Sequence, residues 1–140
     1  MNKGLIRKIT LESDNVCYGP MPESTDVTRQ RVTINRKGRV DILFYQFSGL
    51  LSERKVFYIG KEQADGLIDE LVEYFEGDAI LIFATDIGIW DLTFTSIDKK
   101  MFKYHGSLYC EENDWLSTYS MKLRKMLNEN SLFAFDGCIE

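Results

Sequence analysis

The sequence is poor in several features that mark whole classes of protein. It has only two prolines and one histidine, and its longest uninterrupted apolar run is 79–84. A helix needs about 20 apolar residues to cross a bilayer, so we expect a protein that does not cross a membrane. The first residues, 1–8, place charge after only two apolar residues, which is not the pattern of a secretory signal. We therefore expect a cytoplasmic protein.

The single histidine also limits the chemistry. Serine or cysteine hydrolysis with a histidine base would have to use His105, which lies in a predicted strand. The sequence has no phosphate-binding loop, no glycine-rich dinucleotide motif, no zinc-protease motif and no nucleophile elbow. These absences favour a protein without catalytic activity and without a cofactor.

The cysteines are few and far apart. Cys17, Cys110 and Cys138 are an odd number at long spacings, which favours reduced thiols over a disulfide framework. Together with His105 they would supply the ligand types of a structural zinc site. Such sites usually contain two local ligand pairs, whereas only His105 and Cys110 are close in the sequence. The sequence therefore predicts no metal site and buried thiols.

The charge is acidic overall but divided unevenly. The net charge of -5 argues against general nucleic-acid binding, which depends on neutralising many phosphates. Residues 1–60 contain ten basic and six acidic residues, whereas residues 61–140 contain seven and sixteen. Either the halves fold against each other and neutralise their charge, or they form a bipolar binding surface.

The pattern of apolar residues predicts an α+β fold. Alternation with a period of two indicates strands, and apolar residues at three- and four-residue spacing indicate helices. The predicted strands are 5–12, 27–35, 40–47, 54–59, 80–84, 89–95 and 100–105, and the predicted helices are 61–75 and 115–128. We expect a single domain, 1–140, whose mostly antiparallel sheet is covered on one face by two helices. The element order also allows two β-β-α units in tandem.

Basic residues gather at both predicted hairpin turns. The first turn contains Arg36-Lys37-Gly38-Arg39, and the second contains Lys99-Lys100 with Lys103 nearby. If the two hairpins lie side by side, their turns would form one positive rim that could meet an acidic partner or a phosphate backbone. Solvated turns are also commonly rich in lysine, so the cluster alone does not predict a ligand.

The long connector 13–26 contains both prolines of the chain. A connector of this length inside a compact domain is usually either functional or poorly ordered. Pro20 and Pro22 restrict the backbone of this segment, and Tyr18 offers an aromatic anchor with a polar end. We therefore predict a partner-binding loop, 15–24, whose contact residues are Cys17, Tyr18, Gly19, Pro20, Met21 and Pro22.

This loop carries a resemblance. The run Cys17-Tyr18-Gly19-Pro20-Met21-Pro22, followed by a hairpin with Gly38 in its turn and an amphipathic helix, resembles a small uncharacterised bacterial family. That family bears Cys-Phe-Gly-x-Cys-Pro before a hairpin with a glycine turn. The chain departs from the pattern at Met21, where the family has its second cysteine, so no bond between those positions can form here. The resemblance implies no activity. It implies that the connector is a characteristic feature of the fold.

These observations favour a non-catalytic module that binds a protein partner through the loop 15–24 and the nearby sheet end. A different class, a small-ligand-binding protein or hydrolase, would use a pocket between sheet and helices lined by Asp86, Trp90, His105 and Tyr109. The acidic second half leaves a third class open, an acidic inhibitor or decoy protein. The sequence leaves a homo-oligomer open as well.

Carboxylates near turns allow one further alternative. Asp86 and Asp91 flank Gly88 and Trp90, and Asp98 lies at the next turn, so two of these carboxylates could act as acid and base in glycoside hydrolysis. Aspartate at a tight turn more often accepts hydrogen bonds from backbone N–H groups, and this is the role that we expect.

Overall fold

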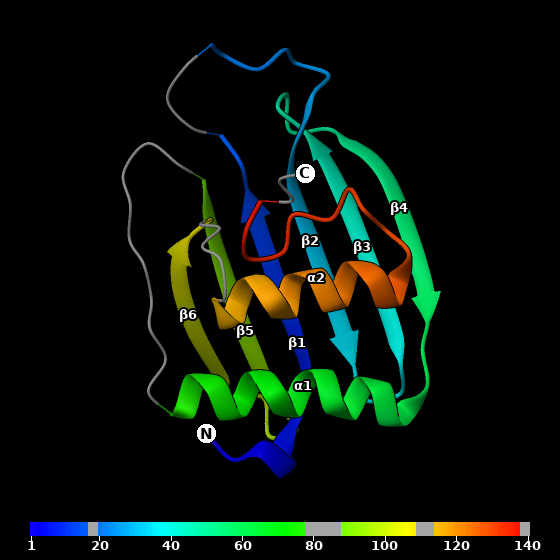
Figure 1. Cartoon of the computed structure of the whole chain (residues 1–140), viewed down its shortest axis with the longest axis vertical. Helices are drawn as coiled ribbons and strands as arrows, with labels where there is room; N and C mark the ends of the chain where they lie inside the picture. Colours follow the sequence, from blue (N-terminus) through cyan, green and yellow to red (C-terminus); the bar gives the residue numbers. More distant parts are fainter. Residues whose placement is uncertain (17–19, 78–87, 109–113, 138–140) are drawn as a thin grey trace.

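The computed structural model describes residues 1–16, 20–77, 88–108 and 114–137 (Figure 1). Within these ranges, six strands and two α-helices follow a short 3-10 helix, Lys3–Leu5. In chain order they are β1 (Ile6–Asp14), β2 (Val27–Asn35), β3 (Arg39–Gln46), β4 (Leu51–Tyr58), α1 (Lys61–Glu76), β5 (Ile89–Ser96), β6 (Met101–Ser107) and α2 (Trp115–Leu127). The predicted strand 80–84 lies outside the described residues.

The strands form one antiparallel sheet. Their order is β4-β3-β2-β1-β5-β6, so β1 lies between the two hairpin systems and pairs with both β2 and β5. The inward-facing residues of β1, β2 and β3 alternate with polar ones, which leaves the opposite face of the sheet to solvent. The α+β class and the antiparallel sheet are confirmed. Tandem β-β-α units are not confirmed, because among the described residues four strands precede α1 whereas two lie between α1 and α2.

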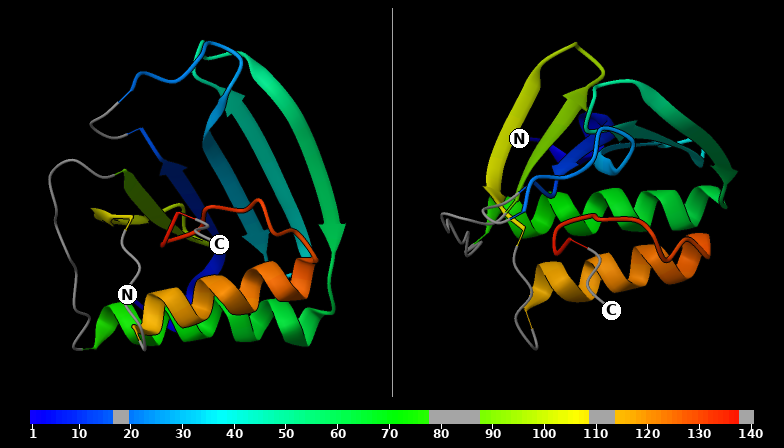
Figure 2. Two further views of the ribbon diagram at one scale, coloured as in Figure 1. Left: turned by 45° about the horizontal axis from the view of Figure 1, so that its top comes forward. Right: turned by 90° about the horizontal axis from the view of Figure 1, so that it is seen from above.

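Both helices lie on the same face of the sheet (Figure 2). The apolar stripe of α1 is buried, and it consists of Ala64, Leu67, Ile68, Leu71, Val72 and Phe75. At its start, the side chain of Gln63 accepts a hydrogen bond from the backbone of Gly60 at 2.9 Å. Helix α2 begins after Asp114, whose carboxylate accepts from the backbone N–H of Ser117. It ends at Asn128, which takes the left-handed conformation with φ 51°.

The segment that follows α2 lies between that helix and the sheet (Figure 2). From the sheet side, the Ser13 hydroxyl donates to the carbonyl of Ala134 at 2.5 Å, and the Gln30 side chain binds the backbone of Ser131 and Phe133 at 2.8 Å. Leu132 and three of its neighbours, Phe133, Ala134 and Phe135, are buried. The apolar run 132–135 is therefore part of the core.

Several boundaries differ from the prediction. β4 begins three residues earlier than the predicted 54–59, and β6 continues two residues beyond the predicted 100–105. Hydrogen bonds to the partner strand, which no local pattern encodes, extend both strands. Among the helices that the structure describes, none is long and apolar enough to cross a membrane.

Candidate functional site

The predicted partner-binding loop, 15–24, is described except for residues 17–19, and hydrogen bonds to the backbone hold the turn at its end. The Asp26 carboxylate accepts from the Glu23 N–H at 2.9 Å, and the Asp26 N–H donates to the Glu23 carbonyl at 3.0 Å. This reciprocal pair closes a tight turn immediately before β2. The predicted contact residues Cys17, Tyr18 and Gly19 lie outside the described residues.

A second segment, the turn between β3 and β4, is joined to this loop. The backbone N–H of Phe47 donates to the carbonyl of Asp26 at 2.8 Å, and that of Ser48 donates to the carbonyl of Ser24 at 3.1 Å. Gly49 gives the turn its sharp reversal with φ 92°. Two segments that are distant in the sequence therefore form one hydrogen-bonded frame at the upper end of the sheet (Figure 1).

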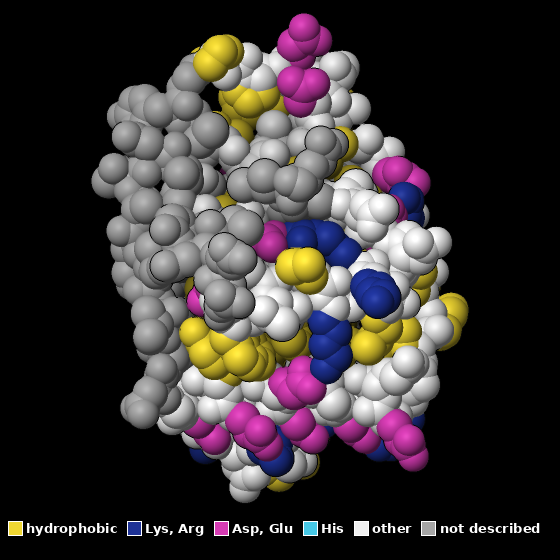
Figure 3. All heavy atoms as spheres, in the orientation of Figure 1, with side chains coloured by type: hydrophobic (Ala, Val, Ile, Leu, Met, Phe, Trp, Pro, Cys, Tyr) yellow, Lys and Arg dark blue, Asp and Glu magenta, His cyan; other side chains and the backbone are white. Residues whose placement is uncertain are grey.

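Large apolar side chains project from this frame into solvent. We call the surface the apolar tip; it consists of Pro20, Met21, Pro22, Phe47, Leu50 and Leu51. Met21 is 80% exposed and Leu50 is 67% exposed. Figure 3 shows hydrophobic side chains at this upper end of the molecule. Exposed apolar side chains mark a protein-binding surface when they form one contiguous patch, whereas single ones are common on protein surfaces.

The alternative pocket predicted from the sequence is not assembled around its two described members. Trp90 is only 2% exposed, and its ring lies 5.0 Å from that of Phe135 in the core. Gly106 on the paired strand leaves room for the indole, because a Cβ there would lie 2.4 Å from the Trp90 ring. His105 is adjacent to Gly106 and therefore points to the opposite, outer face. Asp86 and Tyr109, the other predicted members, lie outside the described residues.

On that outer face, His105 forms a polar contact with Asp91. Its Nδ1 atom lies 2.7 Å from Asp91 Oδ1, and both side chains are about half exposed. The same row across the sheet continues to Glu12, which pairs with Arg31. The arrangement is a row of solvated charges on the sheet, in which water screens each pair.

The carboxylates considered for acid-base chemistry are separated. Asp91 and Asp98 lie on and beyond β5, seven residues apart in the sequence. Asp98 accepts a hydrogen bond from the backbone of Lys100, and a hydrogen bond from Ser96 is the main cause of its lowered pKa. Asp98 therefore has the turn role that the sequence predicts.

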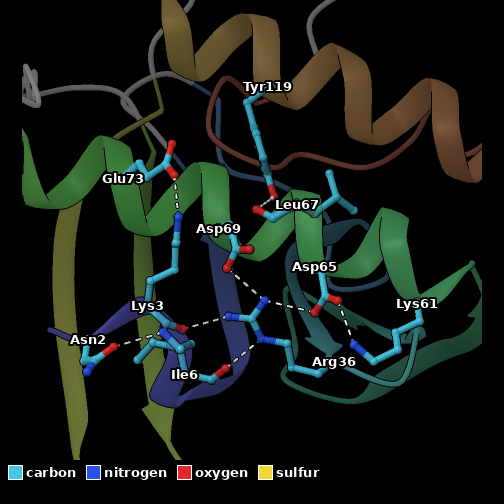
Figure 4. A network of polar contacts seen from close by, with 11 residues as sticks. Asn2, Lys3, Ile6, Arg36, Lys61, Asp65, Leu67, Asp69, Glu73 and Tyr119 are labelled. Atoms are coloured by element: carbon cyan, nitrogen blue, oxygen red, sulfur yellow. Dashed lines mark hydrogen bonds and ion pairs between the residues drawn. The ribbon is translucent and has the colours of Figure 1, made fainter.

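The charges of the two halves of the chain largely meet at α1 (Figure 4). Arg36 contacts Asp65 at 3.0 Å and Asp69 at 2.8 Å, while Lys3 contacts Glu73 at 2.7 Å. Hydrogen bonds from Lys61 and then Arg36 lower the pKa of Asp65, and the hydrogen bond with Glu73 raises the pKa of Lys3. The acidic residues of α1 are thus largely matched by basic residues, as folding of the halves against each other requires.

Two of the surface hollows are lined by the charged residues considered above. The first, of about 510 Å³, lies between α1 and α2, where Tyr74 stacks on Trp115 with ring centroids 4.2 Å apart. The carboxylates at its rim already have partners, since Glu70 pairs with Lys122 and Glu73 with Lys3. The second, of about 580 Å³, lies on the outer face of the sheet and is lined mainly by basic and polar residues.

No group of three or more His, Cys, Asp or Glu is placed to hold a metal in the described part of the chain. The cysteines lie outside this part. We also compared the sequence with protein-family models and with curated proteins, and neither comparison gave a match.

Sequence reasoning located the proline-rich loop but missed the other half of the apolar tip. The turn at 47–51 becomes part of the surface only through backbone hydrogen bonds to the loop. A local signal did exist, because Leu50 and Leu51 are adjacent apolar residues beside the turn glycine Gly49.

Proposed function

We propose that the protein is a non-catalytic module that binds a partner protein through the apolar tip. The observation that carries this proposal is the exposure of Met21 and Leu50 on two segments joined by backbone hydrogen bonds. Solvent-exposed methionine and leucine gain free energy when a partner covers them. Met21 in particular can adapt its shape to an apolar groove.

The size of the gain supports binding. Burying a Met, Leu or Phe side chain fully is worth about 1.5–3 kcal/mol. Part of Phe47 and Leu51 is already covered, so the tip would contribute on the order of 5 kcal/mol of transfer free energy. The hydrogen bonds that hold the loop reduce the ordering cost of binding. The tip would then form the centre of a modest interface, completed by polar contacts around it.

The same features support a binding role over catalysis. His105, the base that hydrolysis would need, lies on the solvated face of the sheet, while Trp90 packs in the core. We further propose that the module acts in the cytoplasm, since the odd number of widely spaced cysteines suits a reducing compartment.

The test replaces exposed apolar residues with aspartate on two different surfaces. Met21→Asp with Leu50→Asp places two charges on the apolar tip. The control Met121→Asp places one charge on α2, at a methionine that is 64% exposed. Immobilised wild-type protein and both variants are incubated with cell extract, and captured proteins are quantified by mass spectrometry. Urea unfolding verifies that each variant is folded.

We expect a partner that wild type and Met121→Asp capture equally and that the tip variant loses. Purified partner should then bind the tip variant at least about tenfold more weakly, because a buried carboxylate must be desolvated. Equal capture by the folded tip variant and by wild type would reject the apolar tip as the binding surface.

A further inference from the structure

The end of the sheet opposite the apolar tip carries a cluster of basic side chains. The turns Asn35–Arg39 and Ser96–Met101 lie on either side of the start of β1. The Arg36 N–H donates to the Arg7 carbonyl at 3.1 Å, and the Ile97 N–H donates to the Leu5 carbonyl at 2.8 Å. The two basic turns therefore lie at the same end of the sheet, with β1 between their hairpins. We call the surface the basic rim; it consists of Arg7, Lys8, Lys37, Arg39, Lys99, Lys100 and Lys103.

The hollow of about 580 Å³ on the outer face opens at this rim. Its walls include Arg7, Lys8, Lys37 and Arg39, and Leu43 adds an apolar contact. Strand register explains the arrangement, because Lys8 pairs with the last residue of β2 immediately before the first turn. Side chains from β1, β2, β3 and the turn between β2 and β3 thus surround one depression that neither helix covers.

The basic side chains that line this hollow differ in whether they have an acidic partner. Two of them are paired, since Arg31 binds Glu12 at 2.5 Å and Arg36 binds Asp65 at 3.0 Å. In the described part of the chain, no ion pair is formed by Arg7, Lys8 or Lys37, and Arg39 has only a 3.5 Å contact with Asp41. Unneutralised like charges repel one another, so an anion that entered the hollow would relieve this repulsion.

We propose that the basic rim binds an acidic, extended segment of a partner protein. This proposal goes beyond the proposed function, because the basic rim is a second binding surface. It lies about 27 Å from the apolar tip, which is the length of a nine-residue strand such as β2. From β3 to β6 the rim crosses four strand spacings, or about 19 Å. An extended peptide covers that distance with about six residues. Several carboxylates on such a segment would meet successive cations.

Charge complementarity favours a protein segment over a nucleic acid. Asp41 and Asp98 interrupt the basic rim, and they would repel a continuous phosphate backbone. An acidic peptide can instead place neutral residues opposite these two carboxylates. Bases bind single-stranded sites by stacking on aromatic rings, and no aromatic residue lines the hollow. The net charge of -5 opposes long-range attraction of nucleic acid as well.

The test measures binding of a fluorescein-labelled peptide of about ten glutamates by fluorescence anisotropy. The rim variant is Lys8→Gln with Lys37→Gln. Its control, Lys122→Gln with Lys125→Gln on α2, changes the net charge by the same amount. We expect the rim variant to raise Kd about fivefold and the control to change it less than about twofold, since each exposed charge contact is modest. Raising the salt concentration from about 20 to 200 mM should weaken wild-type binding and reduce the difference in Kd between wild type and the rim variant.

Three results would overturn the proposal. Equal weakening by the rim variant and its control would mean that the peptide senses only net charge. If the peptide does not bind at low salt, the basic rim is not a binding site for an acidic segment. Tighter binding of a labelled oligonucleotide of about ten nucleotides than of the peptide, with the same loss in the rim variant, would assign the surface to nucleic acid. Because the apolar tip is unchanged in these variants, failure here leaves the proposed function standing.

Discussion

Replacing Asp136 with alanine should strongly destabilise the fold, because it leaves a buried guanidinium without its counter-ion. Arg124, in the last turns of α2, reaches the tail that lies between α2 and the sheet. It donates to the carbonyls of Leu132 at 2.6 Å and Phe133 at 3.0 Å, and it pairs with Asp136. The side chains of Arg124 and Asp136 are 11% and 5% exposed.

The magnitude follows from this geometry. Breaking a buried ion pair costs about 3–5 kcal/mol. The two backbone carbonyls remain bound to Arg124 after Asp136→Ala, so we expect a loss at the lower end, about 3 kcal/mol. Arg124→Ala should cost more, because it leaves the carboxylate and both carbonyls without this donor. The double variant should lose about 2 kcal/mol less than the sum of the single variants, because the two residues act as one unit.

Urea unfolding followed by tryptophan fluorescence measures these losses. Trp90 is a suitable reporter, because it packs against Phe135 next to the pair. With a slope of about 2 kcal/mol per molar urea, Asp136→Ala should lower the midpoint by about 1.5 M. Glu70→Ala is the matched control, since it breaks the exposed pair with Lys122 and should cost no more than about 1 kcal/mol.

A loss below about 1 kcal/mol for Asp136→Ala, equal to that of Glu70→Ala, would refute the reasoning. It would mean that water reaches the guanidinium of Arg124 when its partner is removed. Additive single losses would likewise refute the claim that the tail is held to α2 by this pair.

Two other predictions concern a turn and an ion pair. Gly38→Ala should cost about 2 kcal/mol or more in urea unfolding, because a Cβ would lie 2.2 Å from the Ile59 carbonyl oxygen at a φ of 97°. Gly49→Ala, with φ 92° but open space around it, should cost only about 1 kcal/mol. The hydrogen bond from Arg54 lowers the pKa of Asp41 below its usual 3.8. The pair therefore stabilises the fold above that pH, and its contribution is lost as the pH falls through the lowered pKa. Asp41→Asn should flatten this acid-side loss of the urea midpoint, and an unchanged acid profile would contradict the assignment.

The local elements were readable from the sequence because their signals are local. Helix α1 matches the predicted 61–75 within one residue, since its apolar stripe recurs at helical spacing and Gly77 follows it. The hairpin around Gly38 is equally clear, because alternation on both sides of a glycine turn defines strand, turn and strand. Burial of the tail at Leu132 was also predictable from its apolar composition.

The predicted pocket shows that local sequence signals do not predict which side chains share a face of the sheet. Trp90 and His105 lie on neighbouring strands, and their side chains point to opposite faces because of a single residue of register. Register depends on which strands pair, and the sequence alone did not give the order in which β1 separates the hairpins. The apolar tip has the same origin, since its second half joins the loop through contacts across the sheet end.

By itself, the sequence determined the class of the fold, the type of most elements, the absence of the common catalytic motifs and the position of a stiff loop rich in proline. Periodicity, turn residues and composition depend on a few neighbouring positions, so they can be read from a single sequence without knowledge of the fold. Only the tertiary structure decided which charges remain without partners and which apolar side chains remain in solvent. The pairing of a charge and the burial of an apolar side chain depend on which residues lie within a few ångströms. Strand order and helix docking determine those neighbours. Arg36 is neutralised by α1 whereas the adjacent Lys37 is not, and only the fold distinguishes them.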